Sequence, residues 1–117
     1  MGARFDLVTI DSPATDAIAS FWCAVLDLHE VDREDGDRWI VLADVHGARR
    51  IGVQSGTTVA GSIHLDLACS PDEFDAEVAR IVGLGAQQLG VVRRESYGSI
   101  VNLVDPDGNP FDLCAYT

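Results

Sequence analysis

The chain has 117 residues, of which 47% are hydrophobic, and its 19 acidic and 8 basic residues give a formal net charge of −11. This length predicts one domain, which buries roughly two-thirds of the surface that the unfolded chain exposes. The strong negative charge argues against nucleic-acid and membrane partners, because it repels phosphate backbones and anionic lipid surfaces. No apolar run approaches the ~20 residues that a membrane span needs.

The cysteines and the first residues indicate a reducing compartment. The stretch from Met1 to Asp6 lacks the apolar segment and cleavage site of a secretory signal. The cysteines, Cys23, Cys69 and Cys114, do not have the CxxC spacing of a metal site. We interpret them as buried reduced thiols, which behave as small hydrophobes. We therefore expect a cytoplasmic protein.

The first half of the chain predicts a strand over residues 5–10 and a helix from about Pro13 to Leu26. Ser12 can cap this helix, and proline suits the first helical position. A further strand is expected at residues 39–43, before a turn. The apolar positions of the helix recur with helical spacing and predict its buried face: Ala17, Ile18, Phe21, Trp22 and Val25.

The second half predicts a strand over residues 62–67 and then a helix. Apolar and polar residues alternate along this strand, so His64 and Asp66 point away from the helix side. Ser70 and Glu73 have the spacing of a capping box at the helix start. The buried stripe is expected to hold Phe74, Val78, Ile81 and Val82. Two glycines, Gly83 and Gly85, are expected to end the helix in a left-handed conformation.

The end of the chain predicts a turn at residues 105–110 and a last strand at residues 111–116. The turn contains proline and glycine between aspartates and an asparagine, which is typical of a tight connection. Alternation along the last strand separates two sets of side chains. Phe111, Leu113 and Ala115 are expected to face the helices, and Asp112, Cys114 and Tyr116 to face a cavity or water.

The two halves have the same order of elements, which indicates an internal duplication. In each half a strand runs into a Ser-Pro helix start, and the helix is followed by strands and Gly/Asp-rich turns. We place the modules at about residues 4–56 and 61–117, within a single domain over residues 1–117.

Four segments resemble the vicinal oxygen chelate superfamily. They are the aromatic-rich helix at 21–28, the strand at 64–67, the helix exit at 83–86 and the DPDGNPF segment that begins at residue 105. This superfamily includes glyoxalase I, extradiol dioxygenases and bleomycin-resistance proteins, and the chain is most similar to its small bacterial glyoxalase-like members. The resemblance covers nearly the whole chain. It implies an α+β fold in which two βαβββ modules form a curved mixed sheet, or cup, with the helices on the outer face.

The resemblance also implies four cup-facing metal positions, which fall on Leu7, Gln54, His64 and Asp112. Leucine cannot bind a metal, whereas imidazole and carboxylate are ordinary ligands for Zn, Ni, Mn or Fe. A shift of two residues would put Gly52 in the place of Gln54. The predicted metal ligands are therefore Gln54, His64 and Asp112.

The missing ligand favours a small-molecule binding protein of the bleomycin-resistance type, with a small, partly apolar ligand in the cup. No residue is assigned as catalytic, and a homodimer is expected. The predicted ligand-binding residues are Leu7, Thr9, Trp39, Asp66, Asn102, Cys114 and Tyr116.

Two alternatives remain open. One is a metal-dependent lyase, isomerase or transferase that acts on a small oxygenated substrate. Dioxygenase chemistry is disfavoured, because Leu7 stands where one of its two histidines would be. The other is an interaction module without a small-molecule site, in which His64, Asp66 and Asp112 are the polar face of half-exposed strands.

Overall fold

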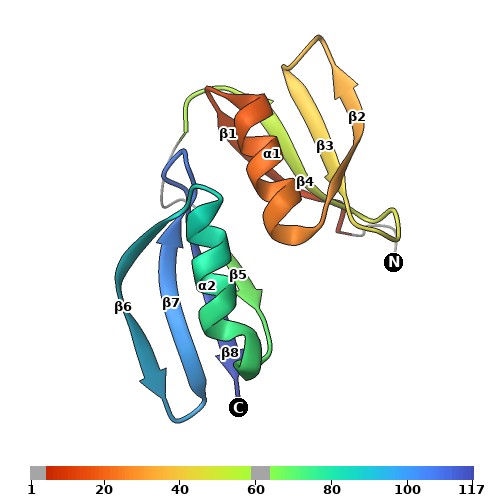
Figure 1. Ribbon diagram of the computed structural model, residues 1–117. Helices are drawn as coiled ribbons and strands as arrows, with labels where there is room; N and C mark the ends of the chain where they lie inside the picture. Colours follow the sequence, from red (N-terminus) through yellow and green to blue (C-terminus); the bar gives the residue numbers. More distant parts are fainter. Residues whose placement is uncertain (1–4, 59–63) are drawn as a thin grey trace. The chain divides into compact units, whose positions relative to one another are not determined.

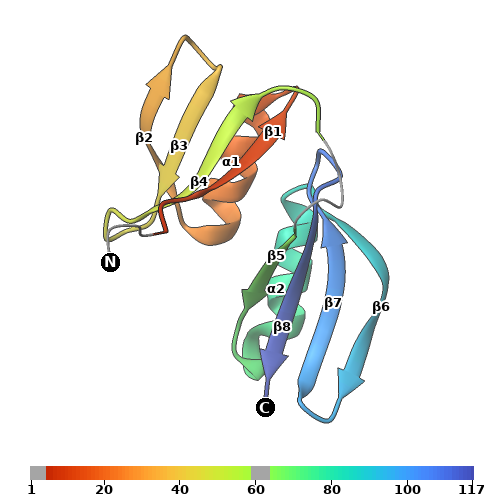
Figure 2. The same cartoon turned by 180° about the vertical axis from the view of Figure 1, so that it is seen from behind.

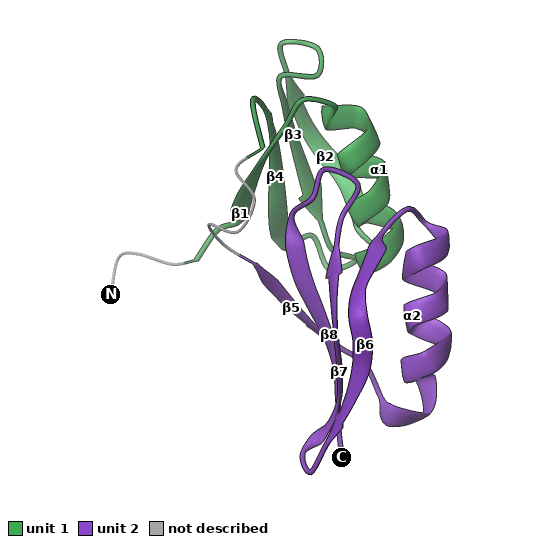
Figure 3. Cartoon of the chain, turned by 90° about the vertical axis from the view of Figure 1, so that its left-hand side faces the viewer, with its two compact units in different colours: residues 1–58 green, residues 59–117 purple. Residues whose placement is uncertain are grey.

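Each half of the chain folds into a strand, a helix and three further strands in the computed structural model, which describes residues 5–58 and 64–117. The two halves form separate compact units, residues 1–58 and 59–117 (Figure 3). The first unit comprises β1 (Val8–Ser12), α1 (Thr15–Leu26), β2 (His29–Glu34), β3 (Trp39–Ala43) and β4 (Arg49–Ser55). The second comprises β5 (Leu65–Ala68), the 3-10 turn η1 (Pro71–Glu73), α2 (Phe74–Gly83), β6 (Gln87–Glu95), β7 (Gly98–Val104) and β8 (Pro110–Tyr116).

Each unit has a four-stranded mixed sheet with the same topology (Figure 1). The strand orders are β1-β4-β3-β2 and β5-β8-β7-β6. The first and last strands of a unit pair in parallel, and the other neighbours are antiparallel. The helix between β1 and β2, or between β5 and β6, carries the chain across the sheet to its far edge. The chain then returns through antiparallel strands, and the last of these lies beside the first strand and parallel to it. The predicted α+β fold with two βαβββ modules is confirmed.

The core of the first unit lies between α1 and one face of its sheet. Phe21 and Trp22 are almost fully buried, and their rings meet edge to face with centroids 5.1 Å apart. Burial of a side chain as large as Trp22 stabilises the fold by about 2–3 kcal/mol. Ala17, which was expected on this face, is exposed, and Ala19 is buried in its place.

The start of α1 differs from the prediction by two residues. The helix begins at Thr15 rather than Pro13, and its N-cap residue, Ala14, has no side-chain cap. Ser12 is the last residue of β1, and its hydroxyl accepts a hydrogen bond from the backbone N–H of Ala14 at 3.0 Å. Ser12 therefore stabilises the turn between strand and helix. The helix ends as predicted at Asp27, which has a left-handed conformation with φ of 54°.

The capping box predicted for the second helix is wrong. Residues 71–73 form a 3-10 turn instead, in which the N–H of Glu73 donates to the carbonyl of Ser70, and neither side chain caps the helix. The buried face of α2 contains Phe74, Val78 and Ile81.

Two details of the end of α2 also differ. Val82 is 39% exposed, because it lies about 80° around the helix from Phe74, outside the buried stripe. Gly83 is the last helical residue, and the left-handed backbone occurs only at Gly85, where φ is 122°.

The turn before the last strand of each unit has the same hydrogen bonds. One carboxylate oxygen of Asp44 accepts from the backbone N–H groups two and four residues ahead, at 2.9 and 3.0 Å. Asp105 does the same at 3.0 and 2.8 Å. In both turns the aspartate N–H also donates to the carbonyl four residues ahead, at 2.9 Å. Such a shared network supports the predicted duplication and confirms a turn in the DPDGNPF segment.

The three cysteines are free, but only Cys114 is buried, whereas Cys23 and Cys69 are half-buried. The expectation of three buried thiols is therefore wrong for two of them. Burial raises the pKa of both half-buried thiols, and nearby glutamates raise it further. No helix in the described ranges is long and apolar enough to cross a membrane.

Candidate functional site

The predicted polar side chains of the second unit lie on the face of its sheet that is opposite α2, which we call the open face. Along β8, Phe111 and Leu113 are buried on the α2 side. Asp112 and Tyr116 alternate with them and point to the other side. Figure 2 shows this sheet with α2 behind it. The alternation predicted from the sequence therefore correctly separates the two faces.

His64, Asp66 and Asp112 form a cluster on the open face. His64 immediately precedes β5, and Asp66 in β5 is the direct neighbour of Asp112 in the parallel strand β8. Nε2 of His64 lies 3.5 Å from Oδ1 of Asp66. One potential ligand atom from each of the three residues lies within 4.8 Å of the others. We call this group the His64 cluster.

Asn102 fixes one carboxylate of the cluster. It lies in β7 directly opposite Asp112, and its side-chain amide donates a hydrogen bond to Oδ1 of Asp112. The other carboxylate oxygen keeps its acceptor capacity. Asn102 therefore orients Asp112 while leaving an oxygen for a ligand.

The charge of the cluster is negative. The side chains of His64 and Asp66 are 54% and 67% exposed. Within the described part of the chain, the contact between an acidic and a basic side chain in the cluster is the one between these two residues. The sequence contains no lysine, and the ion pairs that arginines make in the described residues are with carboxylates outside the cluster. Two neighbouring carboxylates with one imidazole attract a cation.

The donor set fits a divalent metal. Imidazole nitrogen and carboxylate oxygen are common ligands for Zn and for Mn or Fe. Ligand atoms about 2.1 Å from a shared ion are at most about 4.2 Å apart. The three atoms of the cluster, which lie within 4.8 Å of one another, would close on an ion with small side-chain rotations.

The open face becomes apolar and then aromatic along β8. Cys114, two residues beyond Asp112, is 4% exposed and has Ala68 and Ile100 as its strand neighbours. Tyr116 follows, and its ring centroid lies 6.2 Å from that of Tyr97. The pKa of Tyr116 is raised above its ordinary value, mainly by a hydrogen bond with the Cys114 thiol.

The remaining predicted residues lie in the first unit. Leu7 precedes β1, and Thr9 lies in β1 beside Gly52 of β4. Trp39 in β3 is the neighbour of Gln54 in β4. The six others, which are His64, Asp66, Asn102, Asp112, Cys114 and Tyr116, lie together in the second unit.

A comparison of equivalent positions in the two duplicated units shows why the cluster lies in the second unit. Counted from the first register pair of each parallel ladder, its three positions correspond in the first unit to Leu7, Thr9 and Gly52. Gln54 corresponds instead to Cys114. A Cβ atom at Gly52 would overlap the ring of Trp39, so the indole fills the space where a ligating side chain would begin. This difference is visible only from the register of the paired strands. The pattern of apolar and polar residues in the sequence does not give that register.

A pocket of about 250 Å³ lies elsewhere in the first unit, beside Phe5 and the start of β4. Its arginines are already paired, Arg49 with Asp6 at 3.2 Å and Arg50 with Asp44 at 2.9 Å. It therefore offers no unpaired charge, and we base the candidate site on the His64 cluster.

The chain belongs to the glyoxalase-like domain family, whose model matches residues 7–114. No curated protein matches the chain. The resemblance that the sequence indicated is therefore confirmed at the level of the family.

Solved structures share the fold. A glyoxalase/bleomycin resistance protein/dioxygenase family enzyme from Burkholderia phytofirmans has a TM-score of 0.82 at 18% identity, covering 98% of this chain and 100% of that one. A mutant of the fosfomycin resistance protein FosX from Listeria monocytogenes, complexed with Mn(II) and 1S,2S-dihydroxypropylphosphonic acid, has a TM-score of 0.80 at 18% identity, covering 100% of this chain and 93% of that one. FosX from Mesorhizobium loti has a TM-score of 0.76 at 17% identity, covering 100% and 94%.

Proposed function

We propose that this protein binds a small oxygenated molecule on the open face of its second unit, with a divalent metal held by the His64 cluster. The observation that carries the proposal is the approach of three potential ligand atoms to within 4.8 Å of one another. A bound divalent ion would supply Lewis-acid polarisation of two neighbouring ligand oxygens. The solved FosX complex with Mn(II) and a dihydroxypropylphosphonic acid supports this kind of ligand on this fold.

The residues of the chain would bind and orient. His64, immediately before β5, and Asp112 in β8 would hold the ion, and Asn102 holds Asp112 in place through its amide. Asp66 provides the third ligand atom, an addition to the ligand set predicted from the sequence. Because Asp66, Asp112 and Asn102 come from three adjacent strands, their spacing is set by the sheet rather than by a loop.

Catalysis as a lyase, isomerase or transferase is the second candidate. The exposure of Asp66 favours it, since a carboxylate that lies beside a metal without binding it can accept a proton from a bound substrate. Dioxygenase activity remains disfavoured, because the cluster has one histidine.

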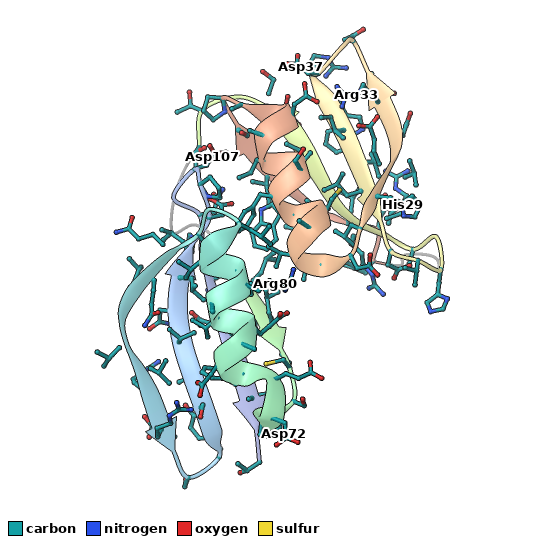
Figure 4. The ribbon with its side chains drawn as sticks, viewed as in Figure 1. His29, Arg33, Asp37, Asp72, Arg80 and Asp107 are labelled. Atoms are coloured by element: carbon teal, nitrogen blue, oxygen red, sulfur yellow. The ribbon has the colours of Figure 1, made fainter. Side chains whose placement is uncertain are left out.

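Metal content tests the proposal. Tag-free protein, His64→Ala and the matched control His29→Ala are reconstituted with Zn, Ni, Mn or Fe(II), dialysed and measured by elemental mass spectrometry. His29 is an exposed histidine of β2 in the first unit (Figure 4). We expect one metal to be retained near stoichiometry by the parent and by His29→Ala, and lost from His64→Ala. Equal retention by all three, or retention by none, would refute it.

We further propose that the protein is a cytoplasmic homodimer. Its free cysteines suit a reducing compartment, and the α1 face opposite the core or a sheet edge could supply the contact. Light scattering at micromolar concentration is expected to give twice the chain mass of 12.5 kDa. A single species at the chain mass would contradict the dimer.

A further inference from the structure

We propose that the tyrosine pair, Tyr97 and Tyr116, forms an aromatic subsite that selects ligands with an oxygen-chelating head and an aromatic tail. The inference deepens the proposed function, because the head would bind at the His64 cluster. It assigns the class of ligand and a residue, Tyr97, that lies outside the cluster and outside the strands that carry it.

The polarity of the open face changes in one direction along β8. Asp112 is at the polar end, Cys114 is two residues further, and Tyr116 is four residues further. At about 3.3 Å a residue, the Cα atom of Tyr116 lies about 13 Å along the strand from that of Asp112. A ligand that contacts both ends must therefore be elongated and amphipathic.

The floor between the two ends is apolar. Cys114 is buried, so the side chains that a ligand can contact between the two ends are its direct neighbours on the adjoining strands, Ala68 of β5 and Ile100 of β7. These side chains carry no charge that would have to lose its hydration under an apolar tail. The floor therefore fits a hydrocarbon spacer.

The aromatic end is exposed. Tyr97 and Tyr116 are 48% and 58% exposed, with their rings tilted by 41°. Gly98 faces Tyr116 across the strand pair and has no side chain to cover the ring. Two adjacent exposed rings favour a third aromatic ring over a saturated group of equal area, because aromatic pairs attract beyond their area burial.

Hydroxamic acids test this selectivity, because they chelate metals through two neighbouring oxygens. Acetohydroxamate is compared by calorimetry with phenyl and cyclohexyl hydroxamates that have short, intermediate and long spacers, using the metal-loaded protein. We expect a phenyl compound with a spacer to bind more tightly than acetohydroxamate and about three- to tenfold more tightly than its cyclohexyl partner.

Variants of the two tyrosines test whether their rings cause the preference for the phenyl group. Tyr97→Ala and Tyr116→Ala are expected to lose the phenyl preference and to keep the affinity for metal and for acetohydroxamate. Tyr116→Phe retains the ring and is expected to keep the preference. Val91→Ala is the matched control, since Val91 is 80% exposed on β6 of the same unit. A phenyl preference that is absent, or unchanged in both alanine variants, would overturn the inference while the metal site stands.

A protein that binds no metal would refute the proposed function and leave the aromatic subsite open to a separate measurement. Benzyl alcohol, a neutral probe, is then titrated into the metal-free protein and followed by the tyrosine ring resonances. Saturable shifts at Tyr97 and Tyr116 that disappear in the alanine variants support the subsite. Absence of such shifts overturns it.

Discussion

At the scale of single residues, two glycines have opposite structural roles. Gly98 begins β7 with φ of 140°, and a Cβ atom there would lie 2.9 Å from the backbone carbonyl carbon of Ala115. Gly83, at the end of α2, has open space around its missing Cβ and no positive φ. The backbone cannot move aside as a side-chain tip can, so only the first glycine is required by its surroundings.

Substitution of these glycines by alanine is expected to change stability in opposite directions. Gly98→Ala should lower the free energy of unfolding by about 2 kcal/mol or more, from strain and overlap. Gly83→Ala should raise it by about 0.5–1 kcal/mol, because glycine loses more entropy in a helix. Urea unfolding of both variants beside the parent measures the difference. A Gly98→Ala variant as stable as the parent would show that the strand pair tolerates the added atom.

Asp44 is expected to make stability depend on pH. The backbone N–H of Ala48 is the main cause that lowers the pKa of Asp44 below its ordinary value of 3.8, and Arg50 lowers it further. A depressed folded-state pKa adds stability above the unfolded value, which is lost as the pH falls through the folded one. This contribution should therefore be present at neutral pH and disappear as the pH falls below about 4.

Asp44→Asn tests this effect in urea unfolding at a series of pH values. The stability difference from the parent should be largest near neutral pH and shrink in acid, where the parent carboxyl is also neutral. Asp37→Asn, an exposed aspartate in the turn after β2 (Figure 4), is the matched control and should show little difference at any pH. A constant difference for Asp44→Asn would argue for lost packing instead.

Much of the site could be predicted from alternation within one strand, and the remainder depends on register between strands. The pattern around His64 and Asp112 assigns both to one face without any pairing information. The addition of Asp66 to the cluster requires the parallel register of β5 and β8. The equivalence of Gly52 with Asp112 requires the register of both units. Local periodicity contains no information on either.

At the scale of elements, the helices were predicted by their apolar spacing, whereas their first turns were not. Ser12 and Ser70 both precede a proline, and the sequence gives them equal claims to a capping role. In the structure, only Ser12 is buried and accepts a backbone hydrogen bond through its side chain. The 3-10 turn after Ser70 meets the same need with a backbone carbonyl, which no side-chain preference reveals.

Ser12→Ala and Ser70→Ala therefore form a matched pair of variants. Loss of the Ser12 hydroxyl leaves the N–H of Ala14 without this partner and should lower the free energy of unfolding by about 1–2 kcal/mol. Ser70→Ala should change it by less than about 0.5 kcal/mol, since its side chain caps nothing. Thermal and urea unfolding measure both. Equal losses would mean that Ser70 caps the helix in solution.

At the scale of the whole molecule, the duplicated topology coexists with divergent faces. Both units have the same strand order and the same aspartate turn. Their buried faces remained apolar because each sheet must cover a helix. The opposite faces do not cover a helix. In the first unit this face has the indole of Trp39 over Gly52, and in the second unit it has the His64 cluster. The shared order was predictable from the sequence because the elements repeat in both halves, whereas packing against a helix does not constrain the divergent faces.

The net charge of −11 predicts that salt stabilises the fold. Screening weakens both repulsion between carboxylates and attraction in surface ion pairs, such as that of Arg33 with Asp16 at 2.7 Å. Nineteen acidic residues face eight basic ones, so repulsive pairs outnumber attractive ones. The melting temperature should therefore rise as sodium chloride increases from about 0.01 to 0.15 M, where the screening length falls from about 30 to 8 Å.

The salt series is run with a chelator, so that stabilisation by a divalent ion at the His64 cluster does not contribute. Asp37→Lys is the informative variant, because Asp37 is an exposed residue of the turn after β2 and its replacement makes the net charge of −11 less negative by two units. Its melting temperature should exceed that of the parent at low salt and rise less with added salt. If the two proteins respond equally, or if salt lowers both melting temperatures, the ion pairs outweigh the repulsion and surface charge does not limit stability.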